Sequence, residues 1–170
     1  LITSVADDFQ ASRGACVVIV GESQPPEVHA LGHAMNQALG NVGKTVTYIE
    51  PVQAEPSDPF ESLALVVEEV DSGKTDTLLI LGGNPTYTAP ADIPFADALH
   101  KLSNSPTGFT AHLSLYQDET TFLSQWHIPE AHYLEAWSDT RAPDGTASIV
   151  QPLITPLYAG RSVHELLGLL

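Results

Sequence analysis

Short apolar runs alternate with longer amphipathic stretches along the first 115 residues of the chain. Runs rich in β-branched residues, bounded by glycine, proline or polar residues, predict four strands at residues 15–20, 45–49, 77–81 and 109–115. Between these runs, apolar residues three or four positions apart predict three helices. Their apolar positions are Val28, Leu31, Met35, Leu39 and Val42, then Phe60, Leu63, Val67 and Val70, then Phe95, Leu99 and Leu102. Strands that alternate with helices in this way are typical of a parallel sheet covered by helices.

Beyond residue 115 the pattern is less regular. Residues 118–125 predict a short helix, and residues 126–128 predict a short fifth strand. Residues 148–150 and 153–154 have β-like composition but adjoin prolines, which interrupt strand pairing. We therefore expect an α/β fold: a three-layer domain with a mostly parallel sheet of about five strands, Rossmann-like in type.

The same pattern predicts how the chain is organised. The polar residues 1–14 are expected to form a loose lead-in, and residues 15–136 are expected to form the α/β domain. Residues 137–170 are expected to add an irregular extension and a C-terminal helix to the same domain. The chain begins at Leu1 and ends inside the apolar stretch 166–170, so we expect a fragment of a longer chain.

The charge of the chain excludes several classes of partner. It has 6 Lys and Arg against 21 Asp and Glu, a formal net charge of −15. The basic residues are scattered, so no basic stripe is available for nucleic acid or for an anionic membrane surface. No apolar run approaches the roughly 20 residues of a membrane-spanning helix, so direct membrane insertion is not expected. Strong acidity instead favours solubility, or a docking face for a basic partner.

Cysteine and histidine limit the metal chemistry. A single cysteine, Cys16, excludes an intramolecular disulfide and a cysteine-ligated iron–sulfur cluster within this chain, and we expect it to be buried. His112, His127 and His132 suggest a metal site, but His127 and His132 are five residues apart with Pro129 between them. We therefore expect no metal site, and histidines that are hydrogen-bonded in a partly buried turn.

A glycine-rich turn, Gly82-Gly83-Asn84-Pro85, follows the third predicted strand directly. Ligands of open parallel sheets bind outside the carboxyl ends of the strands, and glycine lets a backbone approach a nucleotide closely. The turn therefore predicts either a nucleotide-binding loop, in which Asn84 contacts a base or ribose, or a tight turn without a ligand. The chain has no GxGxxG, P-loop or GxSxG motif, and nothing in it fixes a catalytic residue.

Four stretches share their order and spacing with a known family: residues 79–85, 89–92, 118–120 and 128–135. They resemble the molybdopterin oxidoreductase superfamily, which includes dimethyl sulfoxide reductase and formate dehydrogenase. The resemblance implies a Rossmann-like domain of the formate dehydrogenase–dimethyl sulfoxide reductase type, whose turn contacts molybdopterin guanine dinucleotide. If a cofactor is retained, the resemblance implies that the residues that bind it are Gly82, Gly83, Asn84, Pro85, Asp92, Glu119 and Thr120.

Two further stretches, residues 126–135 and 149–154, are similar to one subgroup of that superfamily. This subgroup is the large iron–sulfur subunit of alternative complex III, a bacterial quinol-oxidising membrane complex. There the molybdopterin-type half is a scaffold without its cofactor, beside an iron–sulfur half that carries electrons. Ser114 stands where the superfamily has an acidic residue and Ser138 where it has a glycine, which also favours loss of the cofactor.

The resemblance thus implies an excised, non-catalytic domain of an iron–sulfur subunit in a quinol-linked respiratory electron-transfer complex. It implies no cofactor in this chain, with iron–sulfur clusters in other parts of the parent protein. The implied partners are other domains and subunits of that membrane-associated complex. The implied location is the periplasmic or outer face of the bacterial inner membrane, with a cytoplasmic location as the alternative.

Two other functions stay open from the sequence. The first is the cofactor-binding domain of an active molybdopterin guanine dinucleotide oxidoreductase, in which the cofactor is held by Gly83, Asn84, Asp92, Glu119 and Thr120. The second is a free-standing nucleotide-binding domain, whose turn binds GMP or GDP.

Overall fold

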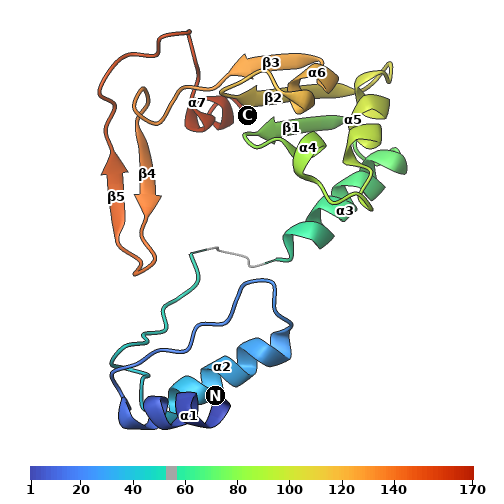
Figure 1. Ribbon diagram of the computed structural model, residues 1–170. Helices are drawn as coiled ribbons and strands as arrows, with labels where there is room; N and C mark the ends of the chain where they lie inside the picture. The colour runs from blue at the N-terminus through green and yellow to red at the C-terminus, as the bar shows by residue number, and fades with distance from the viewer. Residues whose placement is uncertain (53–56) are drawn as a thin grey trace. The chain divides into compact units, whose positions relative to one another are not determined.

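The computed structural model describes residues 1–52 and 57–170. The chain forms two compact units, Leu1–Glu50 and Pro51–Leu170. Each unit contains helices of its own, and the second also contains the strands (Figure 1).

The N-terminal unit is built from two helices, α1 (Ile2–Ala11) and α2 (Pro26–Ala38). Residues 1–14, expected to be a loose lead-in, are therefore helical over most of their length. Phe9 of α1 and Met35 of α2 line the same small cavity. A helix of 10 residues is marginal by itself in water, and no residue of α1 is buried.

Helix α2 ends in a turn that contains glycine. Gly40 follows its last residues with a φ of 68°, and the N–H of Asn41 donates to the C=O of Asn36 at 3.0 Å. This pattern is a Schellman motif, in which glycine adopts the left-handed conformation that ends a helix.

The apolar positions predicted for α2 are mostly exposed, although Leu39 at the end of the helix is buried. Leu31 is 60% exposed and Met35 is 37% exposed, whereas the buried residues of this helix are Gly32 and Asn36. Helix α2 therefore packs a small and polar face against the rest of its unit.

Residues 15–20 and 45–49, expected to be the first two strands, form no strand in this structure. Side chains take the hydrogen bonds that a neighbouring strand would take. The N–H and C=O of Val18 both pair with the side-chain amide of Asn36 on α2, at 2.9 and 2.8 Å. Cys16, expected to be buried, is half-buried. Hydrophobic pattern alone does not reveal such pairing, because it depends on a single polar residue of the helix.

The C-terminal unit contains a three-stranded parallel sheet in the order β1–β2–β3. The strands are β1 (Thr77–Leu81), β2 (Phe109–Ser114) and β3 (Trp126–Pro129). The register places Ile80 beside His112 and His112 beside His127. All three strands lie where the sequence predicts strands, so the α/β character is confirmed. Among the described residues this sheet has three strands, whereas the sequence predicts about five.

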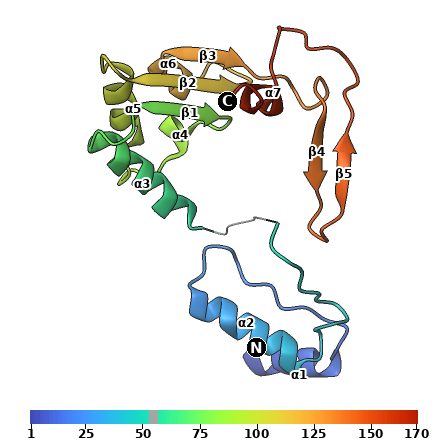
Figure 2. The ribbon, with the colours of Figure 1, turned by 180° about the vertical axis from the view of Figure 1, so that it is seen from behind.

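Four helices of this unit accompany the sheet. Helices α3 (Pro59–Asp71) and α5 (Phe95–Ser103) lie side by side and share a core with Ile80 of β1 (Figures 1 and 2). The short helices α4 (Pro85–Thr88) and α6 (Glu119–Leu123) follow β1 and β2 directly. The buried residues of this core are Val67, Val70, Ile80, Phe95, Ala98, Leu99 and Leu102. Their helical spacing in α5 is the one that the sequence predicts.

Residues 138–170 contain a hairpin and a short helix. Strand β4 (Ser138–Arg141) pairs antiparallel with β5 (Ala147–Val150), and α7 (Val163–Leu167) follows. The β-like residues 148–150 are in β5 as predicted, but residues 153–154 form no strand. Among the helices that the structure describes, none has the length and apolar character needed to cross a bilayer.

Candidate functional site

The turn after β1 has a conformation that favours glycine. Gly82 and Gly83 have φ angles of 75° and 71°, in the left-handed region that residues with a Cβ rarely adopt. The N–H of Gly82 donates to the C=O of Leu113 on β2 at 2.7 Å, which ties the turn to the neighbouring strand. Pro85 then begins α4, where its missing N–H costs nothing. The turn thus lies at the carboxyl end of the parallel strands, where ligands of such sheets bind.

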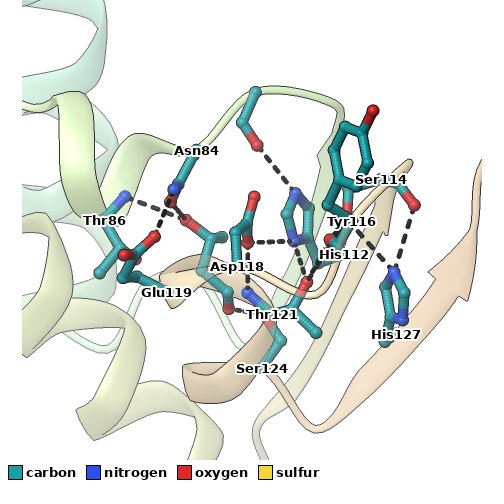
Figure 3. Close-up of polar contacts among 12 residues, drawn as sticks. Asn84, Thr86, His112, Ser114, Tyr116, Asp118, Glu119, Thr121, Ser124 and His127 are labelled. Atoms are coloured by element: carbon teal, nitrogen blue, oxygen red, sulfur yellow. Dashed lines mark hydrogen bonds and ion pairs between the residues drawn. The ribbon is translucent and has the colours of Figure 1, made fainter.

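Three of the predicted site residues, Asn84, Glu119 and Thr120, come together beside this turn (Figure 3). Nδ2 of Asn84 donates to Oε2 of Glu119 at 2.6 Å, and the Thr120 hydroxyl donates to Oδ1 of Asn84 at 2.8 Å. Oγ1 of Thr120 also accepts from the N–H of Thr86 on α4 at 3.0 Å. Both ends of the Asn84 amide are therefore occupied, and the amide joins the turn to the start of α6.

Asp118 fixes the orientation of that helix start. It is the N-cap of α6, and its Oδ1 accepts a hydrogen bond from the N–H of Thr121 at 3.0 Å. A carboxylate at this position satisfies a free helix N–H and favours the positive end of the helix dipole. Asp118 therefore holds Glu119 and Thr120 in the first turn, where they reach Asn84.

His112 of β2 is fully buried beside the turn, and both of its ring nitrogens have partners (Figure 3). Nε2 lies 3.0 Å from the C=O of Gly83, so it carries a proton and donates. Nδ1 lies 2.8 Å from the hydroxyl of Thr121 and 3.5 Å from Oδ1 of Asp118. The sequence marks His112 only as a candidate metal ligand, but here it supports the turn. The signal for this role is a polar residue in the middle of an apolar strand, where burial requires partners.

Ser114 extends the polar network to the end of β2. Its hydroxyl donates to the C=O of Tyr116 at 2.7 Å and lies 3.3 Å from Nε2 of His127. The same nitrogen lies 3.2 Å from the C=O of Ser114, so Nε2 of His127 carries the proton. Ser114 thus links the end of β2 to Tyr116 and to His127 of β3.

The structure does not join every predicted residue to this cluster. Asp92 is exposed in the loop before α5, and no hydrogen bond among the described residues links its carboxylate to Asn84 or Glu119. Nδ1 of His132 accepts from the N–H of Leu134 at 3.3 Å, apart from the pair formed by His112 and His127. Within residues 1–52 and 57–170, no group of three or more His, Cys, Asp or Glu is arranged to hold a metal ion.

One buried atom of the site lacks a partner. It is the hydroxyl oxygen Oγ1 of Thr86 on α4. Among the described residues, every other buried side-chain nitrogen or oxygen has a hydrogen-bond partner. Most buried polar groups are hydrogen-bonded, because an unpaired one costs roughly 1–3 kcal/mol. This hydroxyl is therefore a buried side-chain group of the site that is free to bond to a ligand.

The chemistry of the site is that of a structural clamp. Its side-chain donors and acceptors bond to one another and to the backbone of the turn. The pterin dinucleotide implied by the resemblance would compete with Glu119 and Thr120 for the Asn84 amide, so the site as arranged fits the dinucleotide poorly.

Comparison with protein-family models gives no match for this chain, and comparison with curated proteins gives none either. The relationship to the molybdopterin oxidoreductases therefore stays a prediction from the sequence.

Proposed function

We propose that this chain is a non-catalytic scaffold domain of a molybdopterin-oxidoreductase-like iron–sulfur subunit in a quinol-linked respiratory electron-transfer complex. In this role it binds no pterin cofactor and packs against other domains and subunits of the complex. The complex lies at the periplasmic or outer face of the inner membrane, and the iron–sulfur clusters belong to other parts of the parent protein.

The observation that carries this proposal is the pairing of the Asn84 amide with Glu119 and Thr120, at 2.6 and 2.8 Å. A binding turn has to present such donors to its ligand. Here the same groups fasten α6 to the turn, so their present contribution is to packing. A turn that keeps its shape while its polar groups bond internally supports an architectural role.

The proposal includes a finer statement about the fold. We infer a three-layer, Rossmann-like domain with a mostly parallel sheet of about five strands. Support comes from the parallel order β1–β2–β3 and from the helices that follow β1 and β2 directly, which is the arrangement of successive β–α units.

Cofactor analysis of the full-length parent subunit tests the proposal. We expect iron but no stoichiometric molybdenum, and no guanine nucleotide released on denaturation. An active molybdopterin oxidoreductase processed in parallel serves as the control for recovery. Stoichiometric molybdenum together with guanine nucleotide would overturn the scaffold role.

A variant of the turn gives a second, independent test. Asn84→Ala removes the clamp, so the scaffold role predicts less assembled complex but unchanged quinol oxidation per assembled complex. Thr88→Val on the exposed part of α4 is the matched control, since the Thr88 hydroxyl bonds only to the Asn84 C=O, at 3.0 Å. Normal assembly with lost turnover in Asn84→Ala would contradict the proposal.

A second candidate function is the cofactor-binding domain of an active enzyme of the same superfamily. The unpartnered hydroxyl of Thr86 favours it, because an unsatisfied buried group beside a glycine turn marks a place for a ligand. Thr86→Val separates the two candidates. The scaffold role predicts equal or higher stability of the domain, whereas the enzyme predicts loss of bound guanine nucleotide from the parent subunit.

A further inference from the structure

Helix α2 carries two histidines beside its buried residues, of which His29 is half-buried and His33 is exposed. His29 and His33 are one helical turn apart, with Gly32 and Asn36 on the same face. Residues at positions i and i+4 project side by side, with about 5–6 Å between their Cβ atoms. Two imidazoles at this spacing are positioned to bind one ion together.

Both histidines line a single cavity of about 220 Å³ in the N-terminal unit. The other walls are mostly apolar and come from the irregular segments on either side of α2; they are formed by Val18, Ile19, Val20, Gly32, Asn36 and Val46. The Asn36 amide is bonded to Val18, so it does not compete for a ligand. An apolar cavity with a few convergent polar groups is the usual form of a binding site.

A second observation concerns the orientation of one imidazole. Nδ1 of His33 lies 3.0 Å from the hydroxyl of Tyr48. Metal-binding histidines usually bond their second ring nitrogen to a protein group, which fixes the ring and leaves the other nitrogen free to bind the metal. Tyr48 occupies this supporting position, so Nε2 of His33 is the nitrogen available for coordination.

We propose that His29 and His33 form a two-histidine site for a divalent transition-metal ion, with water in the remaining coordination positions. Imidazole nitrogen suits zinc, copper and nickel, whereas magnesium and calcium prefer oxygen ligands. No Lys or Arg lines this cavity in the described chain, and the net charge of −15 attracts cations. The site shares no residue with the glycine turn, so it does not depend on the proposed scaffold role.

Calorimetric titration of the full chain with Zn²⁺ tests this site. We expect one ion per chain, with affinity at least about tenfold weaker in His29→Gln and in His33→Gln. Tyr48→Phe should weaken binding by roughly tenfold, the effect typical of groups that orient a metal-binding histidine. The matched control is His100→Gln on α5, an exposed histidine outside the cavity, which should bind zinc like the parent chain. Mg²⁺ should not compete.

Electron paramagnetic resonance of the Cu²⁺-loaded chain gives a readout that needs no variant to fold. We expect hyperfine coupling to two imidazole nitrogens. Zinc binding of parental affinity in the His29→Gln/His33→Gln double variant, or a copper spectrum with fewer than two nitrogens, would overturn the proposal.

Discussion

Two buried polar side chains in this protein bond to backbone groups of a turn and of an irregular segment. His112 donates to the C=O of Gly83, and Asn36 pairs with both backbone groups of Val18. In each case one buried side chain forms the hydrogen bond that the backbone of a neighbouring strand or turn would otherwise form. Because a buried backbone group without a partner is costly, these residues contribute more to stability than their surface area alone indicates.

His112→Leu should destabilise the C-terminal unit by about 2–3 kcal/mol. The substitution removes the donor to the Gly83 C=O and the partner of the Thr121 hydroxyl, and Thr121 is buried. Urea unfolding of the chain measures the loss. Exposed His100→Gln serves as the control and should change the free energy of unfolding by less than about 0.5 kcal/mol. Equal stability of the two variants would show that the buried imidazole does not support the turn.

Gly108→Ala should destabilise the protein by roughly 1–3 kcal/mol or more, the range for forcing extra atoms into a packed place. A Cβ at this position would lie 2.0 Å from the C=O oxygen of Leu102, and a backbone atom cannot move aside cheaply. Gly21→Ala is the control, since its nearest atom would be Gln24 Cγ at 4.0 Å. Thermal unfolding of both variants tests the expectation, which fails if Gly108→Ala unfolds at the parental temperature.

At the scale of helices and strands, the sequence predicts most in the C-terminal unit. The buried residues of α5 follow a strict helical period, and β1, β2 and β3 are short apolar runs, so their position is determined by local pattern. Residues 15–20 have the same kind of pattern but form no strand, because strand formation also requires a neighbour with free backbone groups.

The candidate site, too, is predicted only in part from the sequence. The sequence predicts that the turn at Gly82–Gly83 follows a strand, and the resemblance predicts that Asn84 and Thr120 lie beside it. The Asn84 amide pairs with Glu119, and His112 supports the turn, because of the register between the strands. A single sequence does not contain that register.

Helix α7 should lose in acid the part of its N-terminal cap that the Glu165 carboxylate supplies. The backbone N–H of Ser162 donates to Glu165, and this bond, with smaller effects of the Ser162 hydroxyl and of Arg161, holds the pKa of Glu165 below its ordinary value of 4.5. A pKa that is lower in the folded chain stabilises the fold above the unfolded pKa, and that stabilisation is lost as the pH falls through the folded pKa.

Carbon NMR of the Glu165 carboxyl group measures this effect. Its titration midpoint should lie below 4.5, and the helical chemical shifts of α7 should weaken over the same interval of pH. In Glu165→Gln the shifts of α7 should not follow that titration. A midpoint at or above 4.5 in the parent chain would contradict the role of the cap.

At the scale of the whole molecule, charge works against compactness. With 21 acidic and 6 basic residues, the folded chain brings like charges closer together than the unfolded chain does. Three ion pairs, between Lys74 and Glu69, Lys101 and Asp71, and Arg161 and Glu165, are exposed and offset little of this repulsion.

Salt should therefore raise the thermal stability of the chain. Between about 0.01 M and about 1 M salt the Debye length falls from about 30 Å to about 3 Å, which screens the repulsion between surface carboxylates. A gain of about 1 kcal/mol corresponds to a rise in Tm of roughly 2–4 °C for a chain of this size. Thermal unfolding at several salt concentrations measures it.

A charge-reduced variant is the control for this salt effect. Asp7, Glu22 and Asp139 are exposed, so their conversion to Asn, Gln and Asn should preserve the fold. This triple variant should show a smaller rise in Tm with salt. A Tm that falls as salt is added, in the parent chain, would show that attractive ion pairs outweigh the repulsion.

The position of β2 in the middle of its sheet has a consequence for amide hydrogen exchange. Its residues pair with β1 on one side and with β3 on the other, and Ala111 and Leu113 are almost fully buried. Exchange from β2 therefore requires opening of the whole sheet, so its amide protons should be replaced by deuterium last. The glycine turn is anchored to this strand through the Leu113 C=O. Its attachment should thus persist through every local opening that leaves the sheet intact.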